Sequence, residues 1–222
     1  MSAREQIFSR IRTALTVPAT AHHGNRLPTT AEHRRVLPAV GANSDEQLAL
    51  FQKNAAELRA DFQKIRDAAE LVEKLCALRN AEGWQKIASH AGELAGPAAR
   101  QLGLPVLQTD VGFDKNELEI CAVGITECDA LVAQTGSVLL TGRSAGGRAL
   151  SCLPPHHVVI ARRAQLVPDL PAAFDLLQNK YGANYPGMIS FITGPSRTGD
   201  IERILVLGAH GPKRLTIFCL ET

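Results

Sequence analysis

The segment DFQKIRDAAELVEKLCALRNAEGWQKIASHAGELAGPAARQLGLPVLQT, residues 61–109, decides the fold because short strand-like runs alternate with helical runs along it. The strand-like runs are DFQKI, WQKIAS and LPVLQT, and the runs between them are RDAAELVEKLCALRNAEG and AGPAARQLG. Gly83 stands where the first of these helices should end. Such alternation is typical of an α/β sheet whose strands are joined by crossover helices.

The same pattern continues toward the C-terminus. Further strands are predicted within residues 130–141, 156–161, 188–193 and 214–220, and a helix at 171–182. Toward the N-terminus we expect an amphipathic helix at about 2–15, an extended arm at 17–43 and a helix capped by Asn43 or Ser44. We therefore divide the chain at about residue 60. Residues 1–59 form an N-terminal helix, an arm and a second helix, which pack on the core, and residues 60–222 form an α/β domain.

Composition excludes several classes of protein. The chain has 222 residues, of which 45% are hydrophobic and 21% charged, as is normal for a globular protein. The formal net charge is only +2, and no dense run of Lys and Arg suggests a nucleic-acid surface. We expect no nucleic-acid partner.

The five cysteines do not form a metal-binding pattern. Their number is odd, and no C-x-x-C pair occurs. Structural zinc and iron–sulfur sites usually show close thiolate pairs. We predict no metal site and no iron–sulfur cluster in this chain, and we interpret the cysteines as buried, reduced thiols. They are Cys76, Cys121, Cys128, Cys152 and Cys219.

The N-terminal stretch MSAREQIFSRIRTALTV lacks the apolar core of a signal peptide. No apolar run reaches the roughly 18 residues that a membrane-spanning helix needs. A cytoplasmic location is therefore expected.

Three donor-rich loops follow or interrupt the apolar runs of the second half, at residues 134–137, 141–148 and 193–198. Glycine lets the backbone approach an anion, and Ser, Thr and Arg side chains supply donors. None of the loops matches a Walker A or dinucleotide-binding motif, so each alone is more readily a turn. In open α/β sheets ligands bind outside the carboxyl ends of the strands, where we expect an anion-binding crevice. Its predicted ligand-binding residues are Thr135, Gly136, Ser137, Arg148, Thr193, Gly194, Ser196, Arg197 and Thr198.

Acids and histidines near the third loop have competing interpretations. Asp200 is best explained as a residue at a helix start, whereas Glu202 fits either a salt bridge or a site role. His210 lies in a Gly-Pro turn soon after the loop, so Glu202 and His210 are the candidate catalytic residues. His156 and His157 begin a buried strand, where we expect one of them to be packed and hydrogen-bonded rather than bound to metal.

Three stretches together resemble the lactate utilisation protein C family, whose members carry the LUD domain. They are CDALVAQTGSVLLTG at 128–142, GGRALSCLPPHHVVI at 146–160 and TGPSRTGDIERILVLGAHGPKRLTIFCL at 193–220. The family pattern has alanine at the position of Gly199, and it often has an acidic residue at the position of Gln134. If that acid serves as a base or metal ligand in the family, this chain lacks it; if it only accepts hydrogen bonds, Gln134 can substitute for it.

The resemblance implies a three-layer α/β/α sheet of the ribose-5-phosphate isomerase and CoA-transferase type. It also implies a role in oxidising L-lactate to pyruvate with two partner subunits that carry iron–sulfur clusters. No established catalytic residue comes with it, and the cofactor and any homo-oligomer are left open.

Three hypotheses follow. The first is a non-cluster subunit of an L-lactate-oxidising complex that binds a small anionic or phosphate-bearing ligand. The second is a stand-alone enzyme acting on a phosphorylated sugar, a nucleotide or a CoA ester. The third is a structural or regulatory assembly protein whose N-terminal arm docks to partners.

Overall fold

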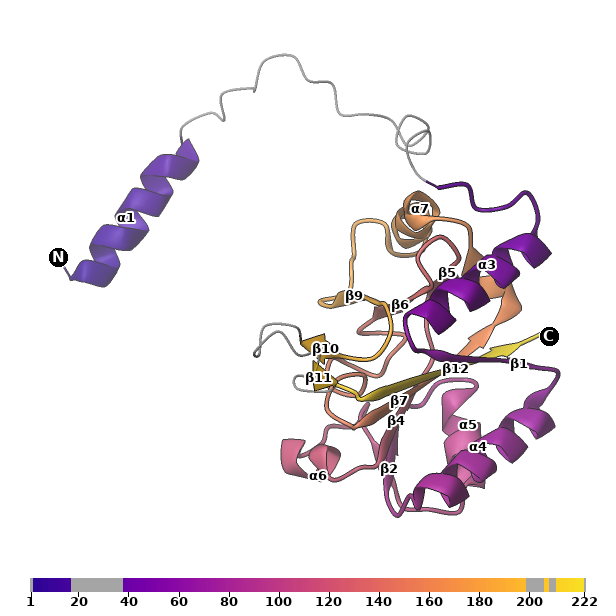
Figure 1. Ribbon diagram of the computed structural model, residues 1–222. Coiled ribbons are helices and arrows are strands. Elements are labelled where there is room, and N and C mark those ends of the chain that lie inside the picture. The colour runs from indigo at the N-terminus through magenta and orange to yellow at the C-terminus, as the bar shows by residue number, and fades with distance from the viewer. Residues whose placement is uncertain (1, 17–37, 199–205, 208–210, 222) are drawn as a thin grey trace. The chain divides into compact units, whose positions relative to one another are not determined.

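The computed structural model describes residues 2–16, 38–198, 206–207 and 211–221. The chain divides into two compact units, Met1–Val36 and Leu37–Thr222. The described part of the first unit is helix α1, Ala3–Thr16, which confirms the helix predicted at 2–15 (Figure 1). It buries none of its residues within that unit, so its apolar stripe is exposed.

The second unit is built around a six-stranded parallel sheet with the strand order β1-β12-β7-β4-β2-β3. The last strand of the chain thus pairs with the first strand of the sheet. The strands are β1 Asp61–Ile65, β2 Ile87–Ser89, β3 Val106–Gln108, β4 Val123–Thr126, β7 His156–Arg162 and β12 Arg214–Leu220. Central strands β4, β7 and β12 are almost completely buried, as expected for a parallel sheet covered on both faces.

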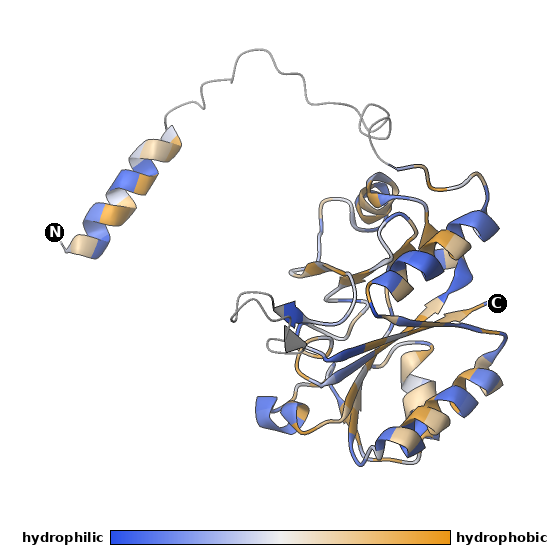
Figure 2. Cartoon of the chain, in the orientation of Figure 1, coloured by the Kyte–Doolittle hydropathy of each residue, from blue (hydrophilic) through white to orange (hydrophobic). Residues whose placement is uncertain are grey.

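Helices α4, Ala68–Glu82, and α5, Ala95–Gln101, cover one face of this sheet (Figure 1). Asp67 caps the start of α4 by accepting the Glu70 N–H, and Gly83 ends it with φ +66°. Helix α3, Ser44–Glu57, packs Leu48 and Phe51 into the core on the opposite face. Figure 2 shows the apolar residues gathered on the strands and on the helix sides that meet them.

A second sheet of four strands lies beside α3, with the order β8-β5-β6-β9. Helix α7, Leu170–Tyr181, packs on this second sheet (Figure 1). The strands are β5 Ala130–Val132, β6 Ser137–Thr141, β8 Leu166–Val167 and β9 Ile189–Ile192. Two smaller elements and a pair of two-residue strands complete the described chain: α6 Lys115–Glu119, the 3-10 turn η1 Arg163–Gln165, and β10 Arg197–Thr198 with β11 Val206–Leu207.

The predicted α/β class is confirmed, and so are the strand and helix alternation of residues 61–109 and the helix after Asn43, which is its N-cap. The sequence predicts strands within 130–141 and 188–193, where β5, β6 and β9 lie, but it does not predict that they form a second sheet, because strand pairing is set by tertiary contacts. The boundary placed at residue 60 falls between α3 and β1, two elements that pack together in the second unit. In the described part of the chain, no helix is long and apolar enough to cross a membrane.

Candidate functional site

A cavity of about 220 Å³ lies against the amino ends of β7 and β12, and the loop that follows β9 forms part of its wall. Three of the predicted residues line it, namely Thr193, Gly194 and Ser196. The sequence led us to expect a crevice at the carboxyl ends of the strands, whereas this cavity lies at the opposite end of the sheet. Its other lining residues are Ser151, Cys152, His157, Ser190, Ile192, Pro195, Gly211, Pro212 and Leu215.

His157 is the histidine that lines the cavity, and only 1% of its surface is exposed. Its Nε2 atom lies 2.9 Å from the Thr126 hydroxyl on β4. Its Nδ1 atom is buried and has no hydrogen-bond partner among the described residues. Burial, with a smaller contribution from His156, lowers the pKa of His157 to about 3. The imidazole is therefore neutral at ordinary pH and has one free hydrogen-bonding position.

His156, the next residue along β7, has both ring nitrogens engaged. Nδ1 lies 3.0 Å from the Glu82 carboxylate, and Nε2 lies 3.0 Å from the Thr216 hydroxyl. Trp84 packs edge-on against the ring. Burial lowers the pKa of His156 even though the neighbouring Glu82 acts in the opposite direction. His156 thus has a structural role, and the free ring position in this pair belongs to His157.

Cys152 differs from the other thiols. It is exposed and lines the cavity, with its Sγ 3.7 Å from the Ser151 hydroxyl. Cys121, Cys128 and Cys219 are buried, and burial raises the pKa of each. The interpretation of all five cysteines as buried thiols is therefore wrong for Cys152, which lies in the turn before β7, and holds only in part for Cys76, which is half-buried on α4.

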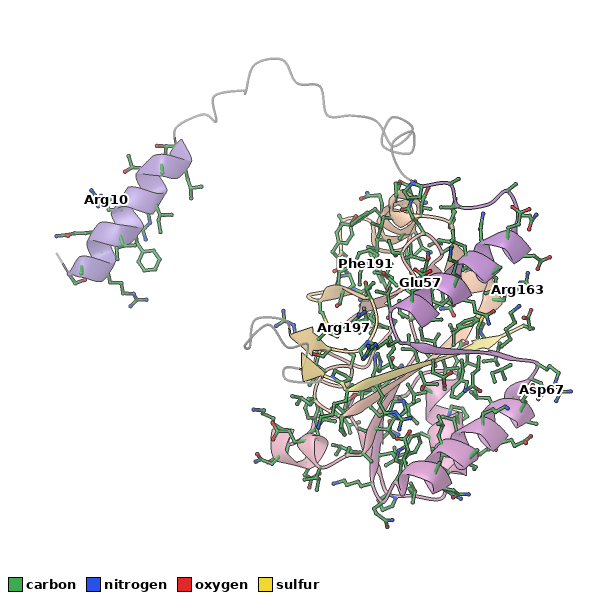
Figure 3. The ribbon with its side chains drawn as sticks, in the orientation of Figure 1. Arg10, Glu57, Asp67, Arg163, Phe191 and Arg197 are labelled. Carbon is green, nitrogen blue, oxygen red and sulfur yellow. The ribbon has the colours of Figure 1, made fainter. Side chains whose placement is uncertain are left out.

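The loop that carries the predicted residues 193–197 is fixed by contacts with the end of α3. Arg197 donates a hydrogen bond of 3.0 Å to the carbonyl of Leu58, the residue that follows Glu57 at the end of α3 (Figure 3). Gly194 has φ +86°, and a Cβ there would lie 2.6 Å from the same carbonyl oxygen. The Thr193 hydroxyl lies 2.7 Å from that of Ser137 at the start of β6. Ser137 and Arg197 therefore position the loop rather than line the cavity.

The Gln134-Thr135-Gly136 segment is the turn of the β5–β6 hairpin, and it packs on α3. The Asn54 amide group donates to the carbonyls of Ala133 and Gln134, at 2.9 Å each. Gly136 has φ +63°, and a Cβ there would lie 2.7 Å from the backbone nitrogen of Ala55. The turn thus needs glycine for its approach to the helix, and neither Thr135 nor Gly136 lines the cavity.

Arg148 also lies outside the cavity lining. It is exposed, and its guanidinium group donates to the Gly187 carbonyl at 3.0 Å. Thr198 lies on β10, opposite Val206. Asp200 and the two candidate catalytic residues, Glu202 and His210, lie outside the described residues. Among the residues that are described, no group of three or more His, Cys, Asp or Glu side chains could hold a metal ion.

A second hollow of about 260 Å³ adjoins the cavity, and both are lined by Pro195 and Leu215. Three cationic residues surround it, Arg59, Lys213 and Arg214, together with Asp61. Arg214 pairs with Glu82 at 2.8 Å, at the outer end of the His156 network. We call this hollow the basic groove, and the one beside His157 the neutral cavity.

At the carboxyl end of the sheet, where the sequence predicts the ligand, several polar groups hydrogen-bond with one another. The Glu127 carboxylate accepts the N–H groups of Leu94 and Ala95 at the start of α5, at 2.7 and 3.0 Å. The Glu127 N–H in turn donates to the His90 ring at 3.2 Å. The Asp110 carboxylate accepts the Ala91 N–H. The polar groups here largely satisfy one another.

Sequence reasoning missed Ser151, Cys152, Arg59 and Lys213 as site residues. The only local signal was the pair of prolines at 154–155, which forces the chain to turn before β7 and so places Cys152 at the surface. Arg59 gave no sequence signal at all, because it reaches the groove through the parallel pairing of β1 with β12, the first and last strands of the sheet.

The fold places the chain in the class of mixed α/β proteins with a central parallel sheet. A solved structure of a DUF162 family protein from Deinococcus radiodurans superimposes with a TM-score of 0.62 over 82% of this chain and 100% of that one, at 20% identity. The model of the LUD domain family matches residues 16–220. The chain belongs to the LUD domain family, within its lactate utilization protein C branch.

Relatives in this branch differ in how much of their length aligns. Lactate utilization protein C from Anoxybacillus flavithermus is 37% identical over 193 residues, which cover 79% of this chain and 81% of that protein. Lactate utilization protein C 1 from Bacillus mycoides is 38% identical over 124 residues, or 55% of this chain. The protein from Bacillus subtilis is 37% identical over 117 residues, or 50% of this chain. The chain spans about half the length of these last two relatives, 51% and 48%.

Proposed function

We propose that this chain is a non-cluster subunit of a system that oxidises L-lactate to pyruvate, with partner subunits that carry iron–sulfur clusters. The observation that carries the proposal is the 37% identity with a lactate utilization protein C over 79% of the chain. The absence of C-x-x-C pairs from the sequence supports a division of labour in which other subunits hold the clusters.

The ligand site of this subunit is the neutral cavity together with the basic groove. Thr193 and Ser196 supply hydroxyl groups to the cavity wall, and Arg59 and Lys213 supply positive charge beside it. A small anionic or phosphate-bearing ligand suits such a combination of donors and cations. Glu202 and His210, which lie outside the described residues, stay our candidates for proton transfer or ligand contact.

The test of the lactate role is deletion of the gene, followed by growth on L-lactate as the sole carbon source. We expect growth on L-lactate to be lost and growth on glucose to be unaffected. Complementation should restore growth with the wild-type gene and with Lys53→Ala, which changes an exposed side chain on α3. Normal growth of the deletion strain on L-lactate, in a genome without a second copy, would remove the proposal.

The test of the subunit role is affinity purification of the tagged chain from lactate-grown cells, with mass spectrometry of what co-purifies. We expect proteins rich in cysteine pairs, with the visible absorbance of iron–sulfur clusters in the purified assembly. A chain that purifies alone and colourless from cells growing on L-lactate would contradict membership of a complex.

The basic groove favours one alternative, an enzyme that acts by itself on a phosphorylated sugar, a nucleotide or a CoA ester. Three cationic residues around one hollow are the observation behind it. The isolated chain should then turn over such a compound without any partner. Turnover by the purified chain alone would favour this alternative over the subunit role.

A further inference from the structure

The second sheet ends in two edge strands, β8 and β9 (Figure 1). The β8 edge has only two residues and is followed directly by Pro168, so it offers little backbone for further pairing. The β9 edge has four residues, pairs with β6 in continuous register, and contains neither proline nor a charged side chain. Natural edge strands are commonly protected from further pairing by charge, proline or a bulge. The β9 strand has none of these.

The free backbone groups of β9 belong to Ile189 and Phe191. The Gly142 N–H donates to the Met188 carbonyl at 3.0 Å, so the backbone groups of Met188 face β6. Because these groups alternate in direction along an antiparallel strand, those of Ser190 face β6 as well, and those of Ile189 and Phe191 face away from it. Within the described chain no hydrogen bond reaches the outward groups. The outer edge of β9 therefore offers two donors and two acceptors to another strand.

Exposed apolar side chains lie along the same edge. Phe174 on α7 is 56% exposed, and its ring centroid lies 5.5 Å from that of Phe191, which is labelled in Figure 3. Ile189 is 38% exposed and lies two residues before Phe191, so both side chains point to the α7 face of the sheet. Tyr185 is 45% exposed, and its hydroxyl donates to the Gln178 side chain on α7. Apolar surface thus accompanies the unpaired backbone.

The charge distribution around β9 favours a second copy of this chain as the partner. The segment YGANYPGMISFITGPS, residues 181–196, contains no Asp, Glu, Lys, Arg or His, although 21% of the chain is charged. A two-fold interface places a segment against its own copy, so a charged edge would repel itself and an uncharged edge does not. Different proteins are more often matched by opposite charges.

Arg148 is the cation closest to this edge among the hydrogen bonds described, since it donates to the Gly187 carbonyl at 3.0 Å. Gly187 precedes β9, so the guanidinium group lies at one end of the strand. In an antiparallel pair the two copies of one strand end lie at opposite ends of the interface. The two copies of Arg148 would therefore be separated by the length of the strand.

We propose that β9 pairs with β9 of a second copy in antiparallel orientation, which joins the two four-stranded sheets into one continuous sheet across a two-fold axis. Pairing of Ile189 with the partner subunit's Phe191, and the reverse, uses all the outward donors and acceptors. Ser190 then lies opposite the partner subunit's Ser190 at the axis. Because Ser190 also lines the neutral cavity, the second copy would lie beside that cavity.

The first test is sedimentation equilibrium of the purified full chain over a range of micromolar concentrations. We expect twice the mass of one chain. Ile189→Lys should raise the dissociation constant of the dimer by about tenfold or more, because a substitution in a two-fold interface acts twice and brings two cations together. Val111→Lys is the matched control, since Val111 is an apolar residue with 86% exposure that lies before α6, and it should leave the dissociation constant unchanged. Urea midpoints equal to that of the wild type establish that both variants are folded.

The second test examines the register. Ser190→Cys is made in a Cys152→Ser background, because Cys152 is an exposed thiol that lines the same cavity. Directly opposite residues of a pair without mutual hydrogen bonds have Cα atoms about 4.5 Å apart, which a disulfide can span. Mild oxidation should therefore yield a covalent dimer on a non-reducing gel. Val111→Cys in the same background should stay monomeric on that gel.

Three results would overturn the inference. They are a wild-type chain that stays monomeric at every concentration, a dimer that Ile189→Lys does not weaken, and a disulfide yield for Ser190→Cys no higher than that for Val111→Cys. If the chain is monomeric and Ile189→Lys abolishes co-purification of other proteins, the edge binds a different partner and not a second copy. The measurements use the isolated chain, so their outcome is separate from that of the growth experiment.

Discussion

The two ends of the parallel sheet are filled in different ways. At the carboxyl end the Glu127 carboxylate binds two N–H groups of α5, and His90 accepts the N–H of Glu127. At the amino end His157 keeps a buried nitrogen unpaired beside a cavity, and Cys152 is exposed there. Polar residues therefore occur at both ends, and each end keeps a buried side-chain atom without a partner in the described chain, Gln108 Oε1 at the end of β3 and His157 Nδ1 near the start of β7. Of these two, His157 is the one that lines a cavity described here.

This difference separates residues that maintain the fold from residues that are available to a ligand. Replacing a group at the carboxyl end should lower stability, since its partners would be left without hydrogen bonds. Replacing a group that lines the cavity should change ligand binding and pH dependence more than it changes packing. The predictions below test that division, in order of decreasing effect.

The largest effect should come from the pH dependence of stability caused by His157. Its pKa is about 3 in the folded state against 6.5 ordinarily, so below pH 6.5 the unfolded chain binds the proton first. The free energy of unfolding should therefore fall with pH below 6.5 by about 1.4 kcal/mol per pH unit from this residue. His157→Gln removes that contribution.

The contribution of His157 is measured by urea unfolding of the wild type and of His157→Gln at several pH values between 7 and 4. Stability curves that run parallel for the two proteins would show that His157 is not held neutral, and the contrast between the two ends would be lost.

Glu127→Ala should have the next largest effect. It should lower the free energy of unfolding by about 1–3 kcal/mol at pH 7, because the N–H groups of Leu94 and Ala95 lose their charged acceptor. Glu127→Gln retains an oxygen acceptor and should lose less. Glu93→Ala is a suitable control, since 85% of that side chain is exposed and its change should stay within about 0.5 kcal/mol. Equal urea midpoints for Glu127→Ala and Glu93→Ala would contradict a capping role.

Gly194→Ala should destabilise the chain by more than about 1 kcal/mol, since the new Cβ would combine a positive φ with an approach to the Leu58 carbonyl. Gly187→Ala provides a matched control, because no atom lies within 4 Å of a Cβ at that position. Thermal unfolding of the two variants gives the comparison. A Gly194→Ala variant as stable as Gly187→Ala would mean that the loop moves freely away from α3.

The smallest effect should come from Ser137→Ala, which removes the hydroxyl contact with Thr193 and should cost about 0.5–1.5 kcal/mol. Thr193→Val should cost a similar amount, and the double variant should cost less than the two losses added together. Strict additivity in urea unfolding would show that the two hydroxyl groups do not depend on each other.

Part of the candidate site could be predicted from the sequence. The donors of the 193–198 loop predict a ligand loop, and of its residues Thr193, Gly194 and Ser196 line the neutral cavity. The turn at 134–136 has the same kinds of residues, yet it packs on α3. The sequence does not distinguish the loop that lines a cavity from the turn that packs on a helix. In both, glycine allows the backbone to approach closely, to an anion in one case and to a helix in the other.

Neighbouring histidines show a further limit. His156 and His157 are identical in type and lie on the same buried strand, so their side chains point to opposite faces of the sheet. One face supplies Glu82 and Thr216 to His156, and the other supplies only Thr126 to His157. These partners come from residues 31 to 74 positions away along the chain.

By itself the sequence determined the α/β class, the strand and helix alternation of residues 61–109 and the family motifs, because local periodicity and capping residues encode them. Only the tertiary structure decided where the cavity lies and which of its groups are unpaired. Those properties depend on the insertion of β12 between β1 and β7, which brings Arg59, Cys152, His157 and Lys213 to one end of the sheet. Such a juxtaposition follows from strand order in space, and strand order is set by burial of the whole core rather than by any one segment.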